Sequence, residues 1–165
     1  MKTPPAYSAA TKIQSGFTLI ELMVALAVLG ILLTVGLPSF QTMIVQQRLS
    51  SATNEVLSGI ALTRSEAVKR NSNMRFCIRS SDPIWQLRDF AATPNVIREG
   101  TLTTGVTFTV SGLGSTPVSG FECIDYKSEG LPYVSSGLLT NGLITLTNGS
   151  QSKAVHIKVG SIYVQ

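Results

Sequence analysis

The chain has 165 residues, of which 44% are hydrophobic and 13% are charged, and its formal net charge is +4. This length accommodates one compact domain plus one long additional element. The apolar residues are concentrated in the first quarter of the chain. Lys2 and Lys12 lie ahead of that apolar segment and the rest of the chain is close to neutral, which does not favour bulk nucleic-acid binding.

The segment from Phe17 to Leu37 is apolar except for Glu21. As a helix it would be about 31 Å long and would span the hydrocarbon core of a bilayer. A cleaved secretory signal is the alternative, but such a signal ends in a small-x-small cleavage site, and here an amphipathic pattern follows Pro38 at once. The polar stretch Met1–Gly16 is typical of a leader that stays on the cytoplasmic side. We therefore expect the apolar segment to be retained.

The pattern after Pro38 is that of an amphipathic helix, with apolar residues at steps of three and four. These residues are Val45, Leu49, Ala52, Val56 and Ile60. No turn cluster interrupts the pattern before residues 71–73, so one helix is predicted from Phe17 to about Arg70. Pro38 removes a backbone donor, which predicts a kink or a segment able to melt over residues 34–38. The alternative is a harmless bend, because membrane helices tolerate Gly and Pro.

From Met74 onwards apolar and polar residues alternate with a period of two, which indicates strands. The predicted strands are Met74–Arg79, Val106–Val110, Phe121–Tyr126, Leu143–Thr147, Ala154–Val159 and Ser161–Val164. Clusters of Gly, Pro, Asn and Ser separate them, and Asn148-Gly149 fits a hairpin turn as well as a glycosylation sequon; we favour the turn. The predicted fold class is α+β: a long N-terminal helix packed by its C-terminal half on a small antiparallel two-sheet β domain.

The two cysteines, Cys77 and Cys123, fall in predicted strands. If this part of the chain is exported, we expect a disulfide between them. Closing a loop of about 47 residues would stabilise the fold by roughly 4 kcal/mol in the chain-entropy account. The alternative is a pair of reduced, buried cysteines in a cytosolic protein.

The stretch from Gly16 to Leu22 reads GFTLIEL and resembles the class III signal of type IV pilins and of the pseudopilins of type II secretion. The resemblance implies a peptidase that cuts between Gly16 and Phe17 and methylates the new amino terminus of Phe17. Burying the carboxylate of Glu21 at membrane depth costs about 2.5 to 3.5 kcal/mol. The positive amino terminus of a neighbouring subunit would neutralise Glu21 and set the register of assembly. A protonated or snorkelling glutamate in a plain anchor is the alternative.

A second resemblance narrows the family to the GspH/FimT group, which includes minor pilins of the FimU type and the H pseudopilin of type II secretion. It depends on the stretch LTRSEAVKRN over residues 62–71. DNA-uptake members of the group carry a Gly-Arg-x-Arg motif near the C-terminus, and the corresponding stretch here, residues 160–163, reads GSIY. The candidate nucleic-acid residues are Arg64, Lys69, Arg70, Arg75 and Arg79, which straddle a helix end and a strand. Direct DNA binding is therefore not favoured.

Catalysis finds little support in the sequence. The histidine His156 alternates with apolar neighbours and is expected at the surface beside Lys158. One His and two distant Cys do not make a zinc set, and no Ser-His-Asp arrangement can be nominated. The stretch Gly112-Leu113-Gly114 is a turn rather than a nucleotide loop. No enzyme activity, metal or cofactor is expected.

The sequence divides into four predicted parts: a cleaved leader (1–16), a membrane or filament-core helix half (17–37), an amphipathic helix half (38–70) and a β-rich head (71–165). The resemblance implies a minor pilin of a type IV pilus at the tip or priming complex. An H-type pseudopilin of type II secretion and a DNA-binding minor pilin are the alternatives. The implied partners are the prepilin peptidase, other minor pilins, the major pilin and an inner-membrane assembly platform. The implied location is the bacterial inner membrane, crossed once with the head in the periplasm, and then the pilus or pseudopilus.

Overall fold

A computed structural model describes residues 16–165, except residues 80, 92, 114–119 and 135–136. All of the predicted leader except Gly16 therefore lies outside the described residues. Helix α1 spans Leu19–Arg70, within two residues of the predicted bounds. The chain forms two compact units, Met1–Phe40 and Gln41–Gln165.

The first unit is helical from Leu19 onwards. Thr18 caps the helix, because the backbone N–H of Glu21 donates to the Thr18 Oγ1 at 3.3 Å. Residues 34–38 are assigned to α1, while the side chain of Pro38 lies outside the description, so the kink there stays a prediction. Among the described residues no single helix is long and apolar enough to cross a membrane. Two lengths of helix, Leu19–Thr34 and Ser39–Arg70, are together long and apolar enough to cross a membrane, judged by length and composition alone.

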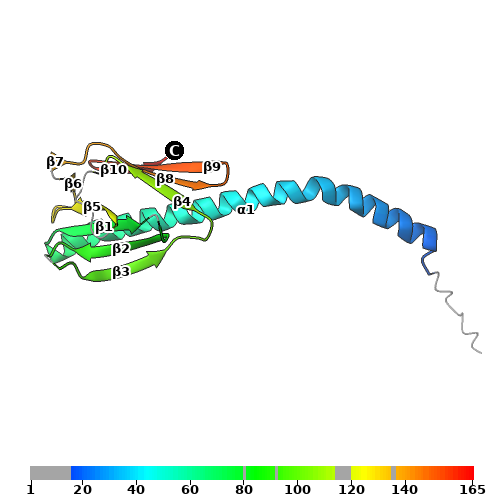
Figure 1. The fold of residues 1–165 in the computed structure, drawn as a ribbon, viewed down its shortest axis with the longest axis horizontal. Coiled ribbons are helices and arrows are strands. Elements are labelled where there is room, and N and C mark those ends of the chain that lie inside the picture. The colour runs from blue at the N-terminus through cyan, green and yellow to red at the C-terminus, as the bar shows by residue number, and fades with distance from the viewer. Residues whose placement is uncertain (1–15, 80, 92, 114–119, 135–136) are drawn as a thin grey trace, which may run out of the picture. The chain divides into compact units, whose positions relative to one another are not determined.

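The second unit contains the rest of α1 and two antiparallel sheets, which Figure 1 shows on the C-terminal part of the helix. The six-stranded sheet has the order β3-β2-β1-β5-β6-β7. Its strands are β1 (Met74–Arg79), β2 (Ile84–Asp89), β3 (Val96–Thr101), β5 (Glu122–Tyr126), β6 (Pro132–Val134) and β7 (Gly137–Leu138). The four-stranded sheet has the order β10-β9-β8-β4. Its strands are β4 (Thr107–Ser111), β8 (Gly142–Asn148), β9 (Gln151–Lys158) and β10 (Ser161–Val164).

One core lies between the amphipathic half of α1 and the sheets. The helix contributes Leu49, Ala52, Val56, Ile60 and Ala67, all of them buried. Alternate residues of the strands complete the core, as a period of two dictates. They include Phe76, Ile78, Leu87, Ile124, Ile144, Leu146, Val155 and Ile157. Four of the five residues in the predicted apolar stripe therefore pack on the sheets, while Val45 is only partly buried and is not part of this core.

Four strands, β2, β3, β6 and β7, were not predicted from the sequence. β2 carries Trp85, whose ring stacks on Phe76 with centroids 5.7 Å apart. The ring lies so close to Gly59 of α1 and Gly100 of β3 that a Cβ added at either glycine would approach it to 3.1 Å and 2.3 Å, respectively. Glycine at these two positions therefore gives the indole its place between helix and sheet.

Candidate functional site

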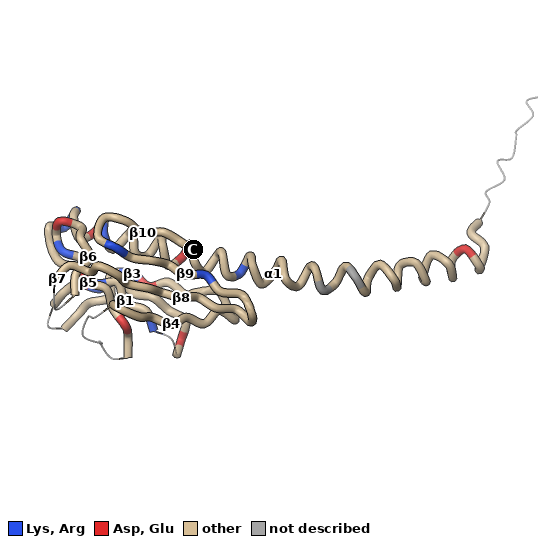
Figure 2. The backbone as a smooth tube through the Cα atoms, turned by 90° about the horizontal axis from the view of Figure 1, so that it is seen from above, with Lys and Arg blue, Asp and Glu red and all other residues tan. Residues whose placement is uncertain are grey.

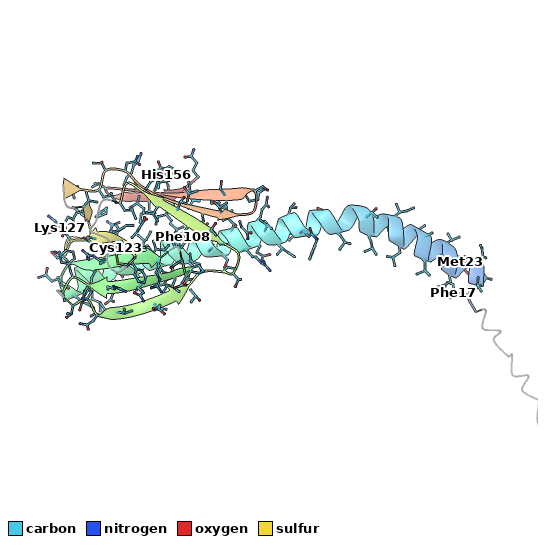
Figure 3. All side chains as sticks on the ribbon, viewed as in Figure 1. Phe17, Met23, Phe108, Cys123, Lys127 and His156 are labelled. Carbon is cyan, nitrogen blue, oxygen red and sulfur yellow. A yellow bond between two sulfur atoms is a disulfide. The ribbon has the colours of Figure 1, made fainter. Side chains whose placement is uncertain are left out.

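The start of α1 is the first part of the candidate site. Phe17 is exposed, and Glu21 lies in the first helical turn with its side chain also exposed. Thr18 and Glu21 are spaced as in a capping box. A negative charge in the first turn also interacts favourably with the positive end of the helix dipole. The acid at this position therefore has a local structural role besides any role in assembly. Figure 3 labels Phe17 and Met23 at this end of the helix.

The apolar side chains along the first half of α1 are exposed. Leu19 is 76% exposed, Leu29 is 50% exposed and Leu33 is 48% exposed. Exposure does not follow a stripe, since apolar residues occur on every side of this length of helix. Figure 2 shows that the charged residues concentrate in the second unit, which leaves the first half of α1 almost uncharged. Contiguous apolar surface of this kind marks a membrane or protein contact.

A disulfide joins Cys77 of β1 to Cys123 of β5, as the sequence predicts. The two residues are directly opposite each other in the antiparallel ladder. They lie on the outer face of the six-stranded sheet, the face turned away from α1, where they pack with Phe121 and Ile84. Figure 3 labels Cys123 in this sheet. The bond therefore fastens the two central strands of this sheet to each other.

Two of the predicted basic residues, Arg75 and Arg79, share this outer face. Arg75 is buried and forms two hydrogen bonds with the carboxylate of Asp125, at 2.5 Å and 2.9 Å. The Phe90 ring covers its guanidinium at 4.5 Å. Arg79 pairs with Asp82 at 2.8 Å. The guanidinium of Arg75 is thus buried and already paired with a carboxylate, so it is poorly placed to contact a phosphate.

A third arginine, Arg88 of β2, joins them and was not anticipated. Its guanidinium and that of Arg79 both lie over the ring of Phe121, at 4.5 Å and 4.6 Å from the centroid. Burial lowers the pKa of Arg88, and the nearby charges of Arg79 and Arg75 lower it further. Arg88 also donates to the side-chain oxygen of Gln86. Only the alternation of β2, once recognised, would place Arg88 on this face.

The other three predicted basic residues lie at the end of α1. Arg70 Nε is 2.6 Å from a carboxylate oxygen of Glu66, and Lys69 Nζ is 3.6 Å from the other. The hydrogen bond from Arg70, with the charge of Lys69, lowers the pKa of Glu66. Arg64 has no carboxylate partner within ion-pair distance among the described residues. The five predicted basic residues therefore occupy different environments: one is buried, three are paired at the surface and one is unpaired.

Two further groups titrate away from their usual ranges. Hydrogen bonds from the side chain and backbone of Asn95 lower the pKa of Asp89. Burial raises the pKa of Tyr126, whose hydroxyl has no hydrogen-bond partner among the described residues. Both shifts thus arise from hydrogen bonding and burial within the fold.

His156 lies on β9 and stacks on Tyr163 of β10, with ring centroids 4.8 Å apart and planes 6° apart. Lys158 lies over the same tyrosine ring at 5.6 Å. Within the part of the chain that the structure describes, no group of three or more His, Cys, Asp or Glu could hold a metal ion. The predicted turn at Asn148-Gly149 connects β8 to β9, and Gly149 has a φ of 60°. Gly112 has a φ of 71°, as a turn requires, while Gly114 is outside the description.

Comparison with known families matches two parts of the chain. The family described as Type II transport protein GspH matches residues 52–162. The Prokaryotic N-terminal methylation motif matches residues 11–37. The fimbrial protein EcpC of Eikenella corrodens is 44% identical over 43 residues, which are 26% of this chain and 28% of that protein. This alignment thus spans less than a third of the length of either protein.

Two solved structures have the same fold. The type IV minor pilin FimU of Pseudomonas aeruginosa is 16% identical, with a TM-score of 0.55 over 73% of this chain and 90% of that one. The minor pseudopilin EpsH of the Vibrio cholerae type II secretion system is 12% identical, with a TM-score of 0.54 over 73% of this chain and 94% of that one. At these identities the likeness establishes the fold alone.

Proposed function

Because this chain belongs to the GspH family, we propose that it is a minor pilin of a type IV pilus, incorporated at the tip or priming complex, where it promotes pilus assembly. The family and fold are those of pilin and pseudopilin structural components rather than enzymes. The single observation that supports the pilus over the secretion filament is the 44% identity with a fimbrial protein over 43 residues. An H-type pseudopilin is the second candidate, supported by the fold shared with EpsH.

The proposal begins with processing. A prepilin peptidase cuts between Gly16 and Phe17 and methylates the amino group of Phe17. The match of residues 11–37 to the N-terminal methylation motif supports this step. The helix from Phe17 to Leu37 then anchors the subunit in the inner membrane, with residues 71–165 as a periplasmic head and residues 38–70 joining the two.

Assembly moves the apolar half of α1 from lipid into a bundle of pilin helices. The exposed apolar side chains between Leu19 and Leu37 support this step, because both environments cover them. In the bundle the methylated amino terminus of a neighbouring subunit faces Glu21. An ion pair there offsets the cost of a carboxylate at membrane depth. Pro38 gives the helix a point at which it can bend during entry into the filament.

Other minor pilins, the major pilin and the assembly platform of the inner membrane are the proposed partners. Nucleic acid is not among them, because four of the five candidate cations already contact a carboxylate of this chain. A gel shift with the full-length protein at low salt checks this exclusion. Robust binding that is lost on substitution of Arg75 and Arg79 would contradict it.

Deletion of the gene tests the proposal. We expect loss of surface pili and of twitching with secretion of type II substrates unchanged, and recovery on return of the wild-type gene. A defect in secretion with normal pili would reject the pilus assignment in favour of the pseudopilus. Normal pili and normal secretion together would reject both.

A further inference from the structure

β10 is an edge strand, and no other strand that the structure describes pairs with its second side. Ala154 of β9 and Gln165 exchange two backbone hydrogen bonds, each of 2.9 Å. In an antiparallel ladder such pairs recur at every second residue, and the register pairs Tyr163 with His156. The backbone N–H and C=O groups of Ile162 and Val164 therefore point away from β9, towards the open edge of the sheet.

This edge lacks the features that normally prevent a further strand from pairing. Protein sheets protect their edges with charged residues, prolines or bulges. β3, one of the two edges of the other sheet, contains Arg98 and Glu99, and its register shifts opposite Leu87 and Arg88. β10 has the sequence SIYV, contains no charge or proline, and pairs with β9 in an unbroken register. It is therefore more receptive than β3, while β4, the opposite edge of the same sheet, shares the absence of charge and proline.

An apolar groove of about 450 Å³ lies beside this edge, within the second unit. Ile162 of β10 lines one side, and Ala61, Ser65 and Val68 of α1 line the other. Val68 is 54% exposed although it is a large aliphatic residue. A strand paired with β10 would cover these side chains as well as the free backbone groups.

The positive charges around the groove favour a ligand that carries a carboxylate. Arg64 and Lys69 line it, and Arg64 has no carboxylate partner among the described residues. Lys69 is 77% exposed, and its contact with Glu66, at 3.6 Å, is longer than that of Arg70, at 2.6 Å. The adjacent turn packs Gly130 against Arg64 and Val68, and its Glu129 forms no ion pair with either cation in the described chain. Arg64 is thus available to a carboxylate from outside, and Lys69 would exchange its longer contact with Glu66 for one.

We propose that the edge of β10 and this groove receive an extended segment of another filament subunit. The segment pairs as an added strand with Ile162 and Val164, inserts alternate apolar side chains into the groove, and presents a carboxylate to Arg64 and Lys69. Added strands of this kind take affinity from main-chain hydrogen bonds and specificity from side-chain pockets. That the segment comes from another filament subunit rests on the proposed function. The binding site itself does not depend on that function.

The test uses the full-length, isotope-labelled protein in detergent micelles. The probe is a short peptide of alternating valine and threonine with an aspartate at each end, and amide hydrogen exchange is followed residue by residue. We expect the peptide to slow exchange at Ile162 and Val164 by about tenfold or more, with little change at Tyr163 and Gln165, whose amides already bond to β9. A peptide with lysine at each end, or with a central proline, should bind at least about tenfold more weakly, equivalent to about 1.4 kcal/mol.

Arg64→Glu and Arg98→Glu form a matched pair of variants. Arg64 of α1 lines the groove beside β10, whereas Arg98 of β3 lines two grooves whose other residues belong to α1, β2 and β3. We expect Arg64→Glu to weaken peptide binding about tenfold and Arg98→Glu to leave it unchanged. The proposal is overturned if the aspartate peptide gives no protection, if it protects other residues instead, or if both variants weaken it equally. Protection of this edge by a single-stranded oligonucleotide in place of the peptide would also overturn it.

This experiment is independent of pilus assembly. If the peptide fails while deletion of the gene abolishes pili, the proposed function stands and this inference falls. If the peptide binds as expected while deletion leaves pili and secretion normal, the binding site is supported. The idea that its partner is a filament subunit is then rejected.

Discussion

The two halves of α1 expose their apolar residues differently. In the first half, large side chains such as Leu19, Leu29 and Leu33 are about half exposed or more, whereas Leu49, Val56 and Ile60 in the second half are almost fully buried. Both halves are helical and both are rich in aliphatic residues. The difference lies in periodicity, because the second half places most of its apolar residues in one buried stripe, with Val68 among the exceptions, and the first half has no such stripe. The chain's own sheets can bury a single apolar stripe. A helix that is apolar on all sides needs lipid or other helices to remove its side chains from water.

The largest expected effect comes from the single acid in the first half. Glu21→Ala should leave the head folded and the protein in the membrane, but reduce its amount in purified pili at least about tenfold, since the proposed ion pair with the neighbouring amino terminus is lost. Quantitative immunoblotting of membranes and of sheared pili measures both.

Glu21→Gln is the matched control for the local role of this residue. Glutamine retains the capping-box function at this position but carries no charge. If Glu21→Gln assembles normally while Glu21→Ala does not, the helix cap is responsible and the ion-pair account is wrong. Normal amounts of Glu21→Ala in pili would contradict both roles in assembly.

The disulfide should give the largest effect on the head. Replacement of both Cys77 and Cys123 by Ala should lower the free energy of unfolding by about 4 kcal/mol, because the loop between them is no longer closed in the unfolded chain. Urea denaturation of the full chain in detergent, followed by the fluorescence of Trp85, measures this change. The same result is expected on reduction of the wild-type protein, and an unchanged midpoint would show that the bond contributes little.

A pair of core truncations compares the two halves of α1 directly. Ile60→Ala should lower the free energy of unfolding of the head by about 2–5 kcal/mol, since it leaves a cavity in a packed core. Leu29→Ala removes a half-exposed side chain and should leave this free energy nearly unchanged. The same denaturation experiment measures both variants, and similar losses in the two would contradict the division of the helix.

The smallest effect concerns pH. Because the pKa of Glu66 is lowered in the folded protein, its ionised form contributes stability that is fully present above the usual glutamate pKa of about 4.3. That contribution is lost as the pH falls through the lower, folded-state pKa. Glu66→Gln should therefore be slightly less stable than wild type at neutral pH and equal to it in strong acid. A constant difference at all pH values would show that the charge is not involved.

Sequence reasoning predicted the elements whose patterns are strong. The bounds of α1, the strands around Cys77 and Cys123, the hairpin turn at Gly149 and the disulfide all follow from periodicity, turn residues and cysteine chemistry. β2 and β3 were missed because their polar residues, including Gln86 and Glu99, are satisfied by cross-strand partners that a local pattern does not reveal.

The candidate site was predictable only in part. The GFTLIEL stretch points to the start of α1, and the structure adds the cap that Thr18 provides to the backbone N–H of Glu21. The pairing of Arg75 with Asp125 joins residues 50 positions apart, so the burial of this arginine depends on sheet register rather than on local sequence. The open edge of β10 likewise depends on the strand order of the sheet.

The central claim is that the apolar half of α1 stays on the mature protein with Phe17 as its first residue. Mass spectrometry of the intact protein from pili or membranes tests it most directly. We expect a chain that begins at Phe17 and carries one additional methyl group on its amino terminus. A mature chain that begins beyond Pro38 would contradict the account, because the helix that is proposed to anchor and assemble the subunit would be absent.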